Sequence, residues 1–198
     1  IINHLIELLE RYGISEIAVL VAREHENDFD RWKKHWWHEL PGVKISIFFE
    51  EKPRGTFGGM EIVRDWLGGE NFILTNGDEL KDFNLKELID FHRRNMPAAT
   101  IALVRVPNPS EYGVPVLDRN WIRDFLEKPE HPPSHFINSG LYIIEQEVFD
   151  YADFSREYLM IEKDIFPRLA SAGKLMGLEM EGGRWYDCGN LERWEKAI

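Results

Sequence analysis

Short apolar runs alternate with segments of helical periodicity through the first half of the chain, and this alternation constrains the fold most strongly. Apolar residues at helical spacing predict helices at 2–12, 25–39 and 85–94, and one more that opens in the glycine-rich segment 55–59 and runs to Trp66. The β-prone runs between them predict strands at 14–22, 43–49, 72–75 and 99–106. Strands that alternate with helices form βαβ crossovers, so we expect an α/β protein with a mostly parallel sheet.

The pattern changes after Pro107, where strand-like runs follow one another directly. Runs at 113–117 and 121–127 flank a turn at 118–120 and predict a β-hairpin. Further on, the sequence predicts a strand at 138–145, a short helix at 147–151, a helix at 159–172 that Pro167 kinks or divides, strands at 175–179 and 184–186, and a final helix at 191–198. We expect one domain, 1–198, in which 1–106 and 107–198 form two parts.

The stretch 72–79, Phe-Ile-Leu-Thr-Asn-Gly-Asp-Glu, is the one around which the expected sheet is arranged. Residues 72–75 show no polar alternation, which favours a strand buried on both faces of a parallel sheet. Gly77 allows a sharp turn, and Asp78 then lies beyond the carboxyl end of the strand, where ligands bind in open α/β sheets. A carboxylate at that edge suits Mg²⁺. The alternative is that Asn-Gly-Asp is a polar turn that caps the next helix.

Composition narrows the range of partners. The formal net charge of −11 argues against nucleic acid and anionic membranes, because phosphate backbones require a basic face. A phosphorylated small molecule needs only a few local donors and stays compatible. The one cysteine, Cys188, excludes an internal disulfide and fits a cytoplasmic protein. No apolar run approaches the roughly 20 residues that span a bilayer. The chain starts without Met, as expected of a piece cut from a longer sequence.

Two further motifs carry residues that could contact a phosphorylated ligand. The segment Gly-Thr-Phe-Gly-Gly at 55–59 lies between a strand and a helix, where backbone N–H groups can approach a nucleotide. Its spacing matches neither a P-loop nor a dinucleotide-binding motif, and a plain loop is the alternative. Glu127 and Lys128 end a strand, so Lys128 could bind a phosphate and Glu127 could accept hydrogen bonds from sugar hydroxyls. Solvated charges are the alternative there.

Asn138 and Asp187 complete the set of candidate residues. Asn138 enters a strand and could bind a hydroxyl, or it could only cap a turn. Asp187 follows a short strand, as Asp78 does. Two carboxylates that the fold brings together could hold one Mg²⁺ over a triphosphate. Alternatively, Asp187 or Asn190 could serve only to cap the final helix.

The order of these motifs resembles that of the sugar-1-phosphate nucleotidyltransferases from end to end. The series is Gly-Thr-x-Gly at 55–58, Asn-Gly-Asp at 76–78, Tyr-Gly-Val at 112–114, Glu-Lys-Pro at 127–129, Asn-Ser-Gly-Leu-Tyr at 138–142, Glu-Lys-Asp-Ile-Phe-Pro at 162–167 and Trp-x-Asp-x-Gly at 185–189. Proteins like mannose-1-phosphate guanylyltransferase and glucose-1-phosphate thymidylyltransferase are the most similar. The resemblance implies a Rossmann-like nucleotide-diphospho-sugar transferase fold, with a mostly parallel central sheet, helices on both faces and a β-rich sugar-binding part.

The resemblance also implies a reaction. An NTP and a sugar 1-phosphate would give an NDP-sugar and pyrophosphate by in-line attack on the α-phosphorus, with Mg²⁺ as cofactor. The protein would contribute positioning and charge neutralisation. The implied catalytic residues are Asp78, Lys128 and Asp187, of which Asp78 and Asp187 hold the metal; Gly55, Thr56 and Gly77 bind the nucleotide; and Gly113, Glu127, Lys128 and Asn138 bind the sugar phosphate.

The sequence departs from the family pattern at three places, which leaves other functions open. The glycine-rich triphosphate loop and its strand, expected before the helix at 2–12, are absent from the sequence, so we expect a fragment. Arg54 stands where the family has Leu, and Cys188-Gly189-Asn190 replaces x-Gly-Thr. One alternative is a non-catalytic nucleotide-sugar-binding regulatory paralogue. Another is a glycosyltransferase, which the lack of Asp-x-Asp after 72–75 disfavours.

Adjacent Trp36 and Trp37 cannot share one helix side, which would suit a homo-oligomer.

Overall fold

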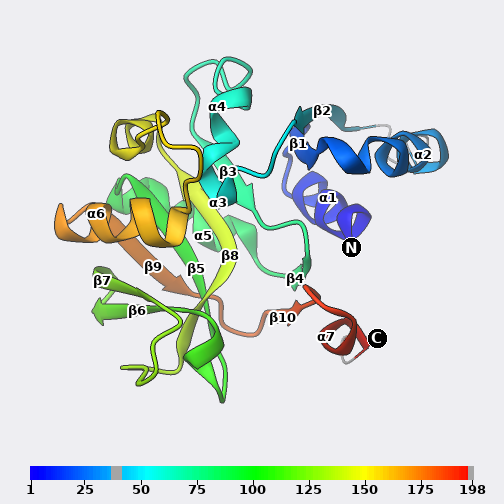
Figure 1. Ribbon diagram of the computed structural model, residues 1–198. Coiled ribbons are helices and arrows are strands. Elements are labelled where there is room, and N and C mark those ends of the chain that lie inside the picture. Colours follow the sequence, from blue (N-terminus) through cyan, green and yellow to red (C-terminus); the bar gives the residue numbers. More distant parts are fainter. Residues whose placement is uncertain (37–41, 196–198) are drawn as a thin grey trace.

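Six strands form the largest sheet in the computed structural model, which describes residues 1–36 and 42–195. Their order is β3 (Phe72–Thr75), β8 (Phe136–Ile144), β5 (Ala99–Arg105), β9 (Leu175–Glu179), β7 (Trp121–Glu127) and β6 (Gly113–Asp118). The parallel pair β1 (Glu16–Ala22) and β2 (Lys44–Glu50) forms a second sheet. The antiparallel pair β4 (Glu79–Asp82) and β10 (Arg184–Asp187) forms a third sheet. In Figure 1 it lies between helix α1 (Ile2–Arg11) and the β6–β7 hairpin.

The expected α/β fold is confirmed, but the six-stranded sheet is mixed and not mostly parallel. Strand β8 runs antiparallel between β3 and β5, while β5 pairs parallel with β9. Since β3 and β5 both oppose β8, they point the same way, as their connection through the helix α5 (Leu85–Asn95) requires. The local alternation of elements gave these directions correctly. It could not give the order, because β8 comes from the part of the chain after the hairpin.

β5 and β8 are buried on both faces and β3 is not, so the prediction that gave this place to 72–75 is wrong. Along β5, Ile101 and Leu103 enter one hydrophobic core, and Ala102 and Val104 enter the other. The residues of β3 are only half-buried, and among the described residues β3 pairs with β8 alone. An apolar run of four residues predicts a strand, but it does not show how many other strands and helices cover that strand.

Helices cover both faces of the sheet, as expected (Figure 1). The first core receives side chains from α3 (Gly55–Gly58), α4 (Met60–Val63) and α6 (Phe166–Ser171). The second core receives them from α1 (Ile2–Arg11) and α5. Pro167 lies in the first turn of α6, where its missing N–H costs no helical hydrogen bond, and a π-helical segment, η5 (Ile161–Ile165), precedes it. The predicted helix 159–172 is therefore divided at its proline.

The remaining elements are η1 (Arg23–His25), α2 (Glu26–Trp36), η3 (Pro109–Glu111), η4 (Gln146–Tyr151) and α7 (Leu191–Glu195). Of these, α2, η4 and α7 agree with the predictions except at their ends, and η1 and η3 were not predicted. The predicted continuations at 37–39 and 196–198, together with Trp37, lie outside the described residues. In α2, Trp32 packs against the second core, whereas Trp36 is 43% exposed. No helix in the described ranges is long and apolar enough to cross a membrane.

Candidate active site

The fold brings Asp78 and Asp187 together at the end of the β4–β10 pair. Asp78 directly precedes β4, and Asp187 is the last residue of β10. The backbone N–H of Cys188 donates to the carbonyl oxygen of Asp78 at 2.9 Å. A Cβ at Gly189 would lie 3.1 Å from Asp78 Oδ2 and 3.1 Å from Asp187 Oδ1, so the two oxygens lie within about twice that distance of each other. The absence of a side chain at Gly189 leaves the space between the two carboxylates open.

The chemistry of this pair fits Mg²⁺, which prefers carboxylate oxygens and commonly binds through one or two of them. Within 1–36 and 42–195, no group of three or more His, Cys, Asp or Glu could hold a metal ion. An ion held by the pair would therefore complete its shell with water and substrate phosphates. Asp187 is already fixed, because it accepts from Gly189 N at 2.8 Å and forms an ion pair with Arg193 of α7. Asp78 is exposed and free to turn toward a ligand.

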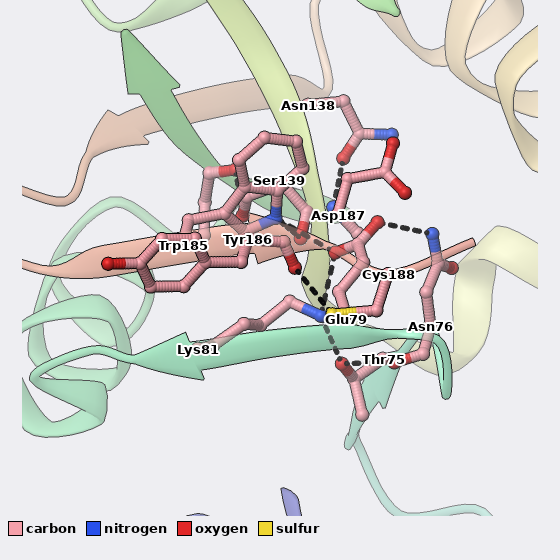
Figure 2. Close-up of polar contacts among 12 residues, drawn as sticks. Thr75, Asn76, Glu79, Lys81, Asn138, Ser139, Trp185, Tyr186, Asp187 and Cys188 are labelled. Atoms are coloured by element: carbon pink, nitrogen blue, oxygen red, sulfur yellow. Dashed lines mark hydrogen bonds and ion pairs between the residues drawn. The ribbon is translucent and has the colours of Figure 1, made fainter. Parts of the chain in front are cut away.

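A buried ion pair that the sequence analysis missed follows Asp78 in β4 (Figure 2). Lys81 Nζ lies 2.8 Å from Glu79 Oε2, and the two side chains are 0% and 10% exposed. Lys81 also donates to Thr75 Oγ1 at 3.1 Å, and Trp185 Nε1 donates to Glu79 Oε2 at 3.0 Å. Burial raises the pKa of Glu79 and lowers the pKa of Lys81, while the charge of each partner opposes that shift. The polar sequence Glu-Leu-Lys-Asp gave no sign that β4 exists.

The glycine loop is docked on the segment before α6. Gly55 has a φ of +84°, and the N–H groups of Phe57 and Gly58 donate to the carbonyl oxygen of Leu159 at 3.0 and 3.2 Å. Thr56 Oγ1 donates to Glu162 Oε2 at 2.6 Å and accepts from the backbone N–H of Ile161 at 2.9 Å. The hydroxyl of Thr56 therefore holds the loop in place. Glu162, which was not among the predicted site residues, is buried beside it.

Gly113, Glu127 and Lys128 lie together where the β6–β7 hairpin ends. Gly113 is opposite Glu127 in the strand register, and a Cβ at Gly113 would lie 2.5 Å from Phe125 Cζ and 3.2 Å from Glu127 Oε2. Lys128 has a φ of +52°, its N–H donates to the Tyr112 carbonyl oxygen at 3.0 Å, and its side chain is exposed. Burial raises the pKa of Glu127. Of these residues Lys128 is exposed, Glu127 is half-buried and Gly113 is buried.

Asn138 is tied up within β8. Its Nδ2 donates to the Tyr142 hydroxyl at 2.8 Å, and its Oδ1 accepts from the Gly140 N–H at 2.9 Å. Its amide therefore bonds within β8, where the pairing with β5 shifts register, and does not cap a turn between elements, which was the alternative in the sequence analysis. Burial, with the nearby charges of Glu162, Glu79 and Glu127, raises the pKa of the fully buried Tyr142 well above its usual value.

Gly77 does not need the freedom of a glycine. Its φ is not in the left-handed region, and a Cβ there would meet no atom within 4 Å. The turn before Asp78 forms as predicted, but the reason given for it, the conformational freedom of Gly77, is wrong. What Gly77 leaves is open space beside Asp78.

The Glu162 carboxyl should make stability depend on pH. Burial is the largest effect on this group and raises its pKa, with the Thr56 hydrogen bond opposing the shift. A raised pKa in the folded state means that stability is fully present below the unfolded-state pKa and is lost as pH rises through the folded-state pKa. Glu162→Gln keeps an acceptor for Thr56 and cannot ionise. Thermal melts should show its melting temperature, relative to the wild type, rising between pH 4 and pH 7.

Glu157→Gln is the matched control, because Glu157 is exposed on the same segment. The difference in melting temperature between Glu157→Gln and the wild type should stay constant over this pH range. A Glu162→Gln difference that is equally flat would contradict the burial argument.

Comparison with known proteins agrees with this geometry. The family model "Nucleotidyl transferase" matches residues 1–198. The chain is 36% identical over 193 residues to a mannose-1-phosphate guanyltransferase of Candida albicans, covering 95% of this chain and 52% of the relative. A second mannose-1-phosphate guanyltransferase, from Saccharomyces cerevisiae, is 35% identical over 193 residues, with the same two coverages of 95% and 52%. The chain spans about half the length of the curated relatives it matches.

Solved structures support the fold independently. A UDP-glucose pyrophosphorylase complexed with UDP-glucose superposes with a TM-score of 0.82 at 20% identity, covering 99% of this chain and 84% of that one. At that identity the likeness speaks for the fold alone. The match of the family model to the whole sequence, the relatives above 30% identity and the fold all lead to one conclusion: the chain belongs to the nucleotidyl transferase family.

Proposed function

We propose that the protein transfers a nucleotidyl group from an NTP to a sugar 1-phosphate, giving an NDP-sugar and pyrophosphate. The observation that carries this proposal is the convergence of Asp78 and Asp187 beside Gly189, in a chain that the nucleotidyl transferase model matches over its whole length. Two carboxylates with open space between them are suited to hold a divalent cation over a polyphosphate.

In the proposed reaction, an oxygen of the sugar 1-phosphate attacks the α-phosphorus of the NTP. The bond from the α-phosphorus to the oxygen that bridges to the β-phosphorus breaks, and pyrophosphate leaves with that oxygen. Mg²⁺ held by Asp78 and Asp187 would supply charge neutralisation for the phosphates. Lys128 would bind the phosphate of the sugar, while Glu127 and Gly113 would line the sugar site. Gly55, Thr56 and Gly77 would lie along the nucleotide. The protein aligns the reactants and needs no covalent intermediate.

The first pair of substrates to test is GTP with mannose 1-phosphate, because relatives at 35% and 36% identity are named for that guanylyl transfer.

Asn138 is the least direct of the proposed sugar ligands, since its amide is already bonded within β8. It would act on the sugar by holding the position of Tyr142.

One observation favours a second function, the binding of a nucleotide sugar without turnover. The Arg193 guanidinium already pairs with Asp187 and with Glu111, so a fixed cation occupies one side of the carboxylate pair. A protein that keeps this arrangement would bind an NDP-sugar and release no pyrophosphate.

Pyrophosphate release separates the two functions. The protein is incubated with Mg²⁺, each of the four NTPs or dTTP, and a panel of hexose 1-phosphates, and pyrophosphate is measured with a coupled enzyme. Turnover with one pair supports the transferase and names its substrates. Binding of an NDP-sugar by calorimetry, with no release from any pair, would support the second function instead.

A further inference from the structure

Three carboxylates meet on the two short strands of the candidate site. In the antiparallel register, Asp187 is directly opposite Glu79, and Asp78 precedes Glu79 in the chain. Residues directly opposite in such a pair share a face, and like charges at those positions repel. Within the described part of the chain, neither β4 nor β10 pairs with a strand of the six-stranded sheet. Something other than a strand ladder must therefore hold the β4–β10 pair in place.

Lys81 supplies a countercharge for Glu79 from inside the protein, as Arg193 does for Asp187 from α7. Lys81 lies two residues after Glu79 on the same face of β4, and it is opposite Trp185 of β10. Its ammonium group is buried between Glu79 Oε2, at 2.8 Å, and Thr75 Oγ1 at the end of β3, at 3.1 Å. The hydrogen bond from Lys81 to Thr75 thus joins β4 to β3 across the turn that carries Asp78.

Glu79 extends the connection to two more elements. Its Oε1 accepts from Asn76 Nδ2 at 3.1 Å, and its Oε2 accepts from Trp185 Nε1. The same Trp185 N–H reaches the carbonyl oxygen of Ser139 in β8 at 3.2 Å. A Cβ at Gly140 would lie 2.6 Å from each oxygen of Glu79, so β8 leaves the carboxylate no room to shift. Figure 2 shows these groups converging around the Glu79–Lys81 pair.

We propose that the buried Glu79–Lys81 ion pair is a positioning element for the metal site, which holds Asp78 and Asp187 at the separation that a divalent cation requires. The inference rests on the proposed function, because it takes these two carboxylates as the metal ligands. Both Glu79 and Lys81 are buried. Both act through the backbone of β4 and through Trp185.

The direction in which one substitution changes the affinity for a cation distinguishes a positioning role from a purely electrostatic one. Lys81→Met removes a positive charge near the metal site, so electrostatics alone would tighten the binding of a cation. If the pair positions the ligands, Lys81→Met weakens binding instead, because Glu79 loses its partner and the turn before Asp78 loses its anchor. Breaking a buried ion pair by removing one residue is strongly destabilising. The experiment therefore needs, beside Lys81→Met, a second variant that keeps the protein folded.

The double variant Glu79→Gln/Lys81→Met is that second variant. Gln keeps an acceptor for Trp185 Nε1, and the double variant leaves no unpaired buried charge. Mn²⁺ alone is titrated into each protein, the free ion is measured by its EPR signal, and the melting temperature is recorded in parallel. Lys86→Met, which removes an exposed lysine of α5, is the matched control and should leave both readings unchanged.

The expected result is that the double variant melts close to the wild type but binds Mn²⁺ about tenfold or more weakly, the usual cost of removing groups that orient metal ligands. Mn²⁺ affinity equal to the wild type in the double variant, or tighter binding in Lys81→Met, would overturn the inference. If the double variant does not fold, Trp185→Phe, which deletes the N–H that bonds Glu79, decides in its place, and unchanged Mn²⁺ affinity there overturns the inference too. Failure of the proposed metal site looks different, because Asp78→Asn would then bind Mn²⁺ as the wild type does.

Discussion

Replacing Asp78 with Asn should lower the rate of pyrophosphate release by about a thousandfold, which corresponds to about 4 kcal/mol of transition-state stabilisation. The carboxylate of Asp78 faces that of Asp187 across the space at Gly189, and an amide offers one neutral oxygen where the carboxylate offers charge. Because Asp78 is exposed, the substitution should leave the melting temperature unchanged. Steady-state rates over a range of Mg²⁺ concentrations measure the effect, which should appear as a higher half-saturating Mg²⁺ concentration and a lower kcat.

The matched control for this prediction lies on the short strand that follows Asp78. Asp82 of β4 is exposed and pairs with Arg11 and Arg184, away from Gly189. Asp82→Asn removes an equal charge only four residues along the chain and should change the rate by less than twofold. Asp78→Asn activity within twofold of the wild type would exclude this carboxylate as a metal ligand.

The elements whose signals are local could be predicted from the sequence. Helix α5 is an example, because Leu85, Leu88 and His92 recur at helical spacing and all are buried. The β6–β7 hairpin is another, because two strand-like runs flank a short turn and pair as expected. The same reasoning placed Asp78 and Asp187 just outside strands, and the structure brings the two together.

The order of the strands could not be predicted, because it depends on pairing between distant segments. Nothing in 72–75 or 99–106 indicates that β8 separates them. A run of apolar residues reports that both faces of a strand tolerate burial, and both β3 and β5 satisfy that condition. β5 is more buried than β3 because it lies between β8 and β9, whereas β3 pairs with β8 alone among the described residues.

The Glu79–Lys81 pair was hidden for a different physical reason. Charged residues are almost never fully buried unless they are paired, so a polar tetrapeptide after a turn predicts an exposed segment. Strand β4 exists because β10, about a hundred residues later, supplies its hydrogen bonds, and because Trp185 covers the pair. The useful signal would have been that Glu79 and Lys81 are spaced to share one face of a strand.

Replacing Gly55 with Ala should destabilise the protein by about 3 kcal/mol, counting the left-handed backbone and two lost hydrogen bonds. Gly55 has a φ of +84°, and its new Cβ would lie 2.4 Å from the carbonyl oxygen of Leu159. That oxygen accepts the N–H groups of Phe57 and Gly58, so it cannot move without breaking both bonds. Thermal melting should show a drop of about 10 °C for a chain of this size. The loop beside the proposed nucleotide site should also loosen, which would raise the KM for the NTP.

Gly69→Ala separates the clash from the backbone strain. Gly69 has nearly the same backbone angle, with a φ of +85°, but a Cβ there would meet nothing within 4 Å. It should therefore cost only the strain of a left-handed alanine, about 1–2 kcal/mol, and leave the KM for the NTP unchanged. The difference between the two variants measures the docking of the glycine loop on Leu159. If both variants melt at the same temperature with the same KM, the loop does not depend on that contact, and the placement of Gly55 and Thr56 along the nucleotide loses its structural support.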